Sequence, residues 1–95
     1  MFYKFASTSD IINMAYERKN PITDSDKIRL QQIGKRIIEL RKRTGLTVEF
    51  FCGKNLIPRI SYSALERGTN FHMTTLLKVL HVHDISLEEF FKGIQ

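Results

Sequence analysis

Several features that many secreted, membrane and catalytic proteins rely on are scarce or absent in this sequence. There is one cysteine, Cys52, and no tryptophan, so the chain can form no internal disulfide and offers no cysteine pair for zinc. A reducing, cytoplasmic compartment is therefore expected. Uninterrupted apolar runs are at most three residues long, and residues 1–7 lack the apolar stretch of a signal peptide, which predicts neither a membrane span nor secretion. With 95 residues, the chain is also too short for a large catalytic fold.

Acidic side chains are outnumbered, and the imbalance belongs to one segment. The whole chain has 15 Lys and Arg against 10 Asp and Glu, a net charge of +5. Residues 27–68 contain ten basic and three acidic residues, net +7, whereas residues 1–26 (three against four) and 69–95 (two against three) are each net −1. A concentrated basic segment is typical of nucleic-acid-binding proteins, although an anionic membrane or a merely soluble surface would share this charge.

Breaks and apolar spacing predict an all-α fold with an N-terminal extension. Asn20-Pro21 interrupts the chain, and we assign residues 1–26 to an extension and residues 27–95 to the folded domain. Ser9-Asp10 can cap a short helix in the extension. The extension is more apolar than a free tail requires, so it is expected to pack on its own domain, on a second copy or on another protein. No segment of the chain shows sustained strand alternation.

Capping and stop signals predict five helices in the domain. Thr23, with Asp26 three residues on, begins a long amphipathic helix that ends at Gly45. A brief second helix starts at Thr47, and a third runs from Pro58, at its first helical position, to Arg67. The last two are a helix capped by Thr74 or Thr75 that stops at Asp84, and a short one opened by Ser86 and ending near Gly93.

Five short segments carry a family pattern: residues 33–42 (IGKRIIELRK), 45–47 (GLT), 65–68 (LERG), 75–78 (TLLK) and 85–91 (ISLEEFF). Together they resemble the lambda-repressor-like (Cro/XRE) helix-turn-helix family. The resemblance runs without gaps over residues 33–91. It implies a five-helix bundle that binds double-stranded DNA, usually as a homodimer and without a cofactor. The second helix would cross the DNA backbone, and the helix Pro58 to Arg67 would lie in the major groove.

The resemblance also implies which residues would meet DNA. The base contacts carried over are Arg59, Ile60, Ser63 and Ala64, with Arg59 suited to guanine and the apolar side chains to a thymine methyl. The phosphate contacts carried over are Lys35, Arg36, Arg41, Arg43, Thr47, Arg67, Thr69 and Asn70. Arg41 would pair with Glu66 and so turn toward a phosphate while bracing two helices; the alternative is an ordinary surface salt bridge.

The sequence departs from the family at the second helix and at the turn. Val48 stands where a phosphate-binding glutamine is common, Leu56 falls on the turn glycine, and Asn55 falls on the buried aliphatic residue before it. A shift of one residue would repair the turn, which predicts Asn55 in the left-handed conformation and Leu56 buried.

No residue constellation suggests catalysis or metal binding. His81 and His83 are two residues apart on a predicted helix, so they point to different faces, and His72 lies on a loop. Cys52 falls inside a short helix, where it resembles a small apolar residue. Ser61 and Ser63 have no evident general base nearby. We therefore expect neither an enzyme nor a metal site.

Two functions are consistent with these sequence features. The first is a transcriptional regulator in the prokaryotic cytoplasm, associated with the nucleoid and acting as a homodimer on double-stranded DNA. The second is a protein-interaction module, antitoxin-like or an adaptor, that binds a partner through the extension. Side chains that would form either a dimer surface or core are Ile28, Leu30, Phe90, Phe91 and Ile94, with core favoured.

Overall fold

The computed structural model describes residues 22–95, and this part of the chain folds into five α-helices with no strand among them. The predicted all-α fold with five helices is confirmed. The short helix expected after Ser9, together with nearly all of the extension, lies outside the described residues.

Helix α2 (Asp24–Thr44) is the longest element and forms one wall of the core. It begins as expected, because the Thr23 hydroxyl accepts a hydrogen bond from the backbone N–H of Asp26 at 3.1 Å. It ends at Gly45, whose φ of 77° is the left-handed conformation that glycine adopts without a Cβ clash. The apolar stripe of Ile33, Ile37 and Leu40 is buried.

Helices α3 (Val48–Asn55) and α4 (Arg59–Arg67) follow, joined by a three-residue turn. Thr47 caps α3 as predicted, accepting a hydrogen bond from the N–H of Phe50 at 3.3 Å. Pro58 is the N-cap of α4 rather than its first helical residue, so that expectation was wrong by one position. The Pro58 carbonyl accepts the first helical hydrogen bond, from the N–H of Tyr62 at 3.0 Å.

The register predicted for this turn was wrong. Leu56, not Asn55, adopts the left-handed conformation, with φ of 56°, and its side chain is 80% exposed. Asn55 is the last residue of α3, and its side-chain amide donates to the carbonyl of Phe51 at 2.8 Å. The apolar residue that the turn buries is Ile57, which is 4% exposed. Burying Ile57 outweighs the strain at Leu56, because a buried isoleucine contributes about 1.5–3 kcal/mol and a left-handed leucine costs about 1–2 kcal/mol.

Helices α5 (Met73–His83) and α6 (Leu87–Phe91) complete the bundle. The prediction that Thr74 or Thr75 caps α5 was wrong: His72 is the N-cap. Thr75 is instead buried beside Leu76 inside the helix, so packing rather than local capping decides where α5 begins. Asp84 ends α5 with φ of 55°, and Ser86 caps α6 by accepting from the N–H of Glu89 at 3.1 Å, both as expected.

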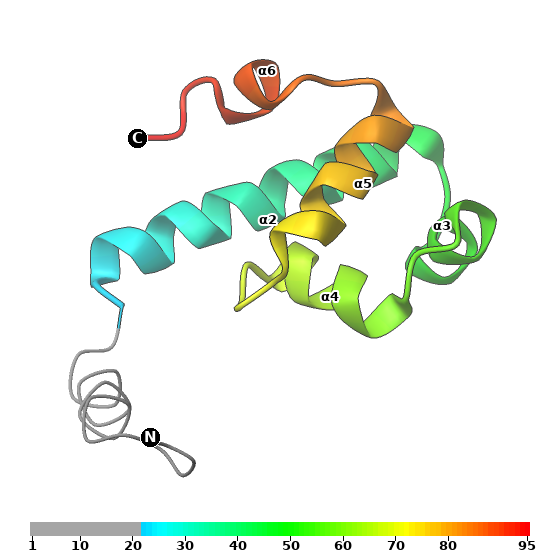
Figure 1. The fold of residues 1–95 in the computed structure, drawn as a ribbon, viewed down its shortest axis with the longest axis horizontal. Helices are drawn as coiled ribbons and strands as arrows, with labels where there is room; N and C mark the ends of the chain where they lie inside the picture. Colours follow the sequence, from blue (N-terminus) through cyan, green and yellow to red (C-terminus); the bar gives the residue numbers. More distant parts are fainter. Residues whose placement is uncertain (1–21) are drawn as a thin grey trace, which may run out of the picture.

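Helix α4 packs directly across α2, and two glycines permit this. A Cβ on Gly34 would collide with the carbonyl oxygen of Glu66, and one on Gly68 with the carbonyl of Leu30. Figure 1 draws α4 below α2 and α6 above it, with α5 crossing α2. The side chains buried among these helices are Ile33, Ile37, Leu40, Phe51, Cys52, Ile57, Tyr62, Leu65, Leu76, Val79, Leu80 and Phe90.

The favoured assignment to the core is correct for four of the five residues predicted to form either core or a dimer surface. Phe90 belongs to the core, with 4% of its surface exposed. Leu30, Phe91 and Ile94 are half-buried against that core. Ile28 is 54% exposed, so it does not contribute to the core.

Candidate nucleic-acid interface

The outer face of α4 is formed by the residues to which the family resemblance assigned base contacts. Tyr62 and Leu65 face inward and are fully buried. Ile60 is 86% exposed, and Ser63 and Ala64, three and four residues further along, share its face. Ser63 and Ala64 have small side chains and are half-buried on this face.

Arg59 does not stand free at the start of α4. Its guanidinium lies 3.3 Å from the carboxylate of Glu49 in the first turn of α3, and the two side chains are 63% and 69% exposed. Sequence reasoning missed this ion pair, since the two residues lie in different helices and no spacing rule relates them. A base contact by Arg59 therefore has to share the guanidinium with Glu49 or displace the carboxylate.

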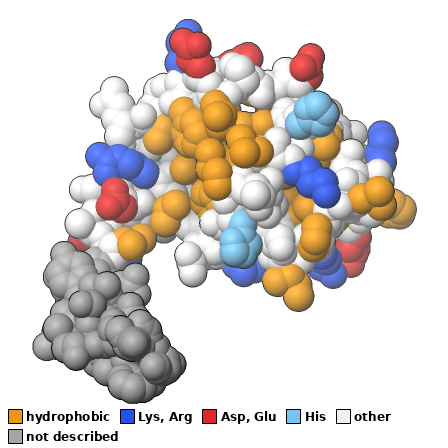
Figure 2. Space-filling model, viewed as in Figure 1, with side chains coloured by type: hydrophobic (Ala, Val, Ile, Leu, Met, Phe, Trp, Pro, Cys, Tyr) orange, Lys and Arg blue, Asp and Glu red, His pale blue; other side chains and the backbone are white. Residues whose placement is uncertain are grey.

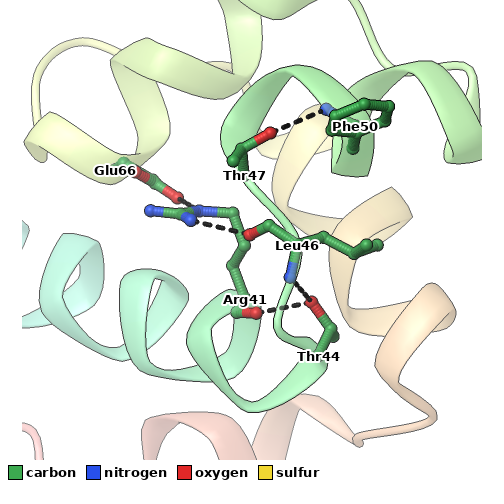
Figure 3. Close-up of polar contacts among 6 residues, drawn as sticks. All are labelled: Arg41, Thr44, Leu46, Thr47, Phe50 and Glu66. Carbon is green, nitrogen blue, oxygen red and sulfur yellow. Dashed lines mark hydrogen bonds and ion pairs between the residues drawn. The ribbon is translucent and has the colours of Figure 1, made fainter.

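The pair expected between Arg41 and Glu66 is present, and it is not a surface salt bridge. The Nε of Arg41 donates to Oε2 of Glu66 at 2.7 Å, and its Nη1 donates to the carbonyl of Leu46 at 2.9 Å (Figure 3). The two side chains are only 15% and 12% exposed. The hydrogen bond that the Arg41 guanidinium donates to Glu66 raises its pKa above the ordinary value. The pair thus ties together α2, the linker to α3, and α4. Contact between Arg41 and a phosphate stays a prediction, for which Nη2 is the nitrogen without a described partner.

The linker that leads into α3 is held by its own hydrogen bonds. The hydroxyl of Thr44 donates to the carbonyl of Arg41 at 2.5 Å and accepts from the N–H of Leu46 at 3.1 Å (Figure 3). Thr47 is exposed and caps α3. These contacts fix the direction of the α3 N-terminus, whose first N–H groups lack helical partners and suit an anion such as phosphate.

A second group of expected phosphate contacts lies at the far end of α4. Arg67, Thr69 and Asn70 are exposed and line a shallow depression between the start of α2 and the loop after α4. Lys27 lines the same depression. Sequence reasoning did not single out Lys27, because only the packing of α4 on α2 brings it beside Arg67.

Three of the expected phosphate contacts are not brought to this surface. Lys35, Arg36 and Arg43 line depressions beside α6 and the C-terminal residues, and a guanidinium nitrogen of Arg36 donates to the carbonyl of Phe90. Figure 1 places α6 on the opposite side of α2 from α4. Helical periodicity explains this for Arg36 and Arg43, which are two and nine positions from Gly34 and so rotated by roughly 200° and 180° from the face that meets α4.

His83 and Cys52 pack within the fold, whereas His72 and His81 are exposed. Residues 22–95 contain no group of three or more His, Cys, Asp and Glu side chains placed to hold a metal. The ring of His83 stacks on Phe51 at 5.4 Å, and burial, with the charge of Arg43, lowers the pKa of His83. Cys52 is 4% exposed, and its burial raises the pKa of the thiol, which keeps the unreactive protonated form.

Comparison of the chain with protein-family models, with curated proteins and with solved structures produced no match. None of the described helices is long and apolar enough to cross a membrane. What this surface does has to be inferred from its own geometry and charge.

Proposed function

We propose that this protein binds double-stranded DNA in a sequence-specific way, with α4 in the major groove, and regulates transcription as a homodimer that needs no cofactor. The observation that carries the proposal is the shape of the α4 surface. Helix α4 presents the exposed side chains of Arg59, Ile60 and Arg67 beside a tight turn and α3, and the Arg41–Glu66 pair ties α4 to α2 and to the linker before α3. A rigid helix presented in this way fits the width of the major groove.

The charges around α4 support the same proposal. Thr47 caps the neighbouring helix α3, and Arg67, Asn70 and Lys27 lie at the C-terminal end of α4. Phosphate contacts by these groups would position α4 over the base edges. Arg59 would then donate two hydrogen bonds to guanine once it leaves Glu49, a contact that discriminates by about 1–3 kcal/mol.

The homodimer in this proposal has its own support. Hydrophobic side chains gather on the face where α5 crosses α2, below α6 (Figure 2). Exposed apolar patches of this kind mark protein interaction sites. Two copies related by a two-fold axis would place two α4 helices on successive turns of one DNA face, which predicts a palindromic site.

The proposal is tested by titrating labelled duplex pools at about 50 and 200 mM salt and sequencing the bound fraction. Binding should weaken steeply with salt, and a palindromic sequence should be enriched. Arg59→Ala should relax the sequence preference at one base pair, whereas Arg67→Ala should weaken binding on all sequences and reduce the salt slope by about one. Arg43→Ala is the matched control, because it removes the same charge beside α6 and should change the slope less. Binding that does not depend on salt would exclude the proposal.

The second candidate is a protein-interaction module, and the hydrophobic face in Figure 2 is the observation that favours it. In this case the partner would be captured through the extension and that face. Deleting residues 1–20 should then abolish capture of a partner in a pull-down and leave DNA binding unchanged. If the deletion has no effect on capture, the extension is not the binding element.

A further inference from the structure

A depression of about 310 Å³ lies between α2 and α6. Its α2 wall consists of Arg36, Glu39, Leu40 and Arg43, whose spacing of three, four and seven residues places them on one face of the helix. The opposite wall comes from residues 85–92, which contain α6. The volume is at the lower end of the range of small-molecule sites, about 300–1,000 Å³. Figure 1 places α6 on the opposite side of α2 from α4, so the depression is separate from the surface proposed to meet DNA.

The base of the depression is apolar and belongs to the core. Among its lining residues, Leu40 is 8% exposed, Phe90 is 4% exposed and Ile85 is half-buried. The two walls are joined directly, because a guanidinium nitrogen of Arg36 donates a hydrogen bond to the carbonyl of Phe90. The depression therefore offers a fixed apolar surface that an apolar group of a ligand would cover.

Charged side chains of both signs surround this base without pairing. Glu39 and Arg43 lie four residues apart on α2, a spacing at which ion pairs commonly form on a helix. Glu89 and Lys92 line the depression from the α6 side. All four side chains are exposed, and none takes part in any of the three ion pairs of residues 22–95. Two carboxylates and two cations thus remain available to a bound molecule.

This combination of charges restricts the chemistry of the ligand. A simple anion would be repelled by Glu39 and Glu89, and a simple cation by Arg43 and Lys92. A molecule with one charge of each sign is attracted by both groups. An apolar portion between or beside those charges would in addition cover the base of the depression.

We propose that the depression between α2 and α6 binds a small zwitterion, a free α-amino acid with an apolar side chain. The carboxylate of the ligand would be held by Arg43 and Lys92, and its ammonium group by Glu39 and Glu89. The ligand side chain would lie on the buried base. This site goes beyond the proposed function, since it uses none of the residues on α4.

Such a ligand would join two helices, because α2 and the α6 segment each supply one carboxylate and one cation. Binding to the folded state alone raises its stability. The first test is therefore thermal unfolding of the full chain with free leucine, valine or phenylalanine. At ten times its Kd, the amino acid that fits should raise Tm by about 6–11 °C.

Two derivatives of leucine separate the two charges. N-acetyl-leucine lacks the ammonium group, and leucinamide lacks the carboxylate. Each should bind about fivefold more weakly than leucine, since each loses one exposed ion pair. Isothermal titration calorimetry gives the affinities.

Substitutions locate the site. Arg43→Gln and Glu39→Gln each remove one charge from the α2 wall and should weaken leucine binding about fivefold. Lys54→Gln is the matched control, because it removes an exposed charge on α3 outside the depression and should leave the affinity unchanged.

Three results would overturn the inference. If no apolar amino acid raises Tm or gives a binding isotherm, the depression is not a ligand site. If N-acetyl-leucine binds as tightly as leucine, the site takes anions rather than zwitterions. If Arg43→Gln and Glu39→Gln bind leucine as well as the unaltered protein does, the ligand binds elsewhere. None of these results bears on DNA binding, which the salt titration tests separately.

Discussion

Removing the Glu66 carboxylate should destabilise this protein far more than removing any exposed carboxylate. Glu66→Ala leaves Arg41 without its partner, and arginine cannot shed its charge at any ordinary pH. The guanidinium, which is 15% exposed in the intact protein, would keep only its hydrogen bond to the carbonyl of Leu46. Losing one partner of a buried ion pair costs about 3–5 kcal/mol, and the residual exposure here places the expected loss near the lower end, about 3 kcal/mol.

The measurement is thermal and urea unfolding followed by far-ultraviolet circular dichroism. For a domain of this size a loss of ~3 kcal/mol lowers Tm by about 12–24 °C. It is also a large share of a total stability of about 5–14 kcal/mol expected for a chain of this length. The variant should therefore still fold, with about 2–11 kcal/mol of stability left, and melt at a clearly lower temperature.

Two exposed ion pairs provide matched controls. Glu49→Ala breaks the pair with Arg59, and Asp26→Ala breaks the pair with Arg29, in which the side chains are 47% and 55% exposed. Each should cost no more than about 1 kcal/mol. The double variant Arg41→Met with Glu66→Leu should recover most of the loss, because it leaves no buried charge. If Glu66→Ala costs as little as Glu49→Ala, the pair does not brace α2 against α4.

Three further predictions concern backbone geometry and pH. Leu56→Gly should raise the free energy of unfolding by about 0.5–1 kcal/mol by relieving the left-handed strain, whereas Leu56→Ala, which keeps a Cβ, should not; urea midpoints decide between them. Because burial lowers the pKa of His83, the unfolded chain binds a proton more readily than the folded protein, and stability should fall as the pH drops below about 6.5. His83→Phe should flatten that part of a stability profile between pH 7.5 and 5.5, and an unchanged slope would contradict the role given to His83. Gly34→Ala should unfold the protein or displace α4, since its Cβ would overlap the carbonyl oxygen of Glu66, whereas Gly53→Ala, in open space, should be tolerated in the same melting assay.

Local signals in the sequence predicted most of the helix ends correctly. The caps at Thr23, Thr47 and Ser86 and the stops at Gly45 and Asp84 all depend on hydrogen bonds or dihedral angles within four residues of the helix end. Such interactions are properties of a short stretch of chain, so the sequence contains the information needed to predict them.

Where local preference competed with burial, the sequence was misleading. At the turn, Asn55 is the better left-handed residue, yet Leu56 takes that conformation because Ile57 is the side chain that fits the core. At the start of α5, the hydroxyl of Thr75 is a good cap, yet this residue is buried in the helix interior and His72 is the N-cap. In both places a few kilocalories of packing outweigh about one kilocalorie of local preference.

The candidate site likewise has features that the sequence alone predicts and features that depend on the tertiary structure. The sequence by itself determined an all-α chain, the apolar faces of its helices and a basic middle segment, because these follow from residue order and period. Only the tertiary structure decided that Arg41 and Glu66 are covered, that Arg59 meets Glu49, and that Arg36 and Arg43 turn toward α6. Each of these depends on how two helices are rotated about their axes and packed together, and that rotation is set by the whole core rather than by any one segment.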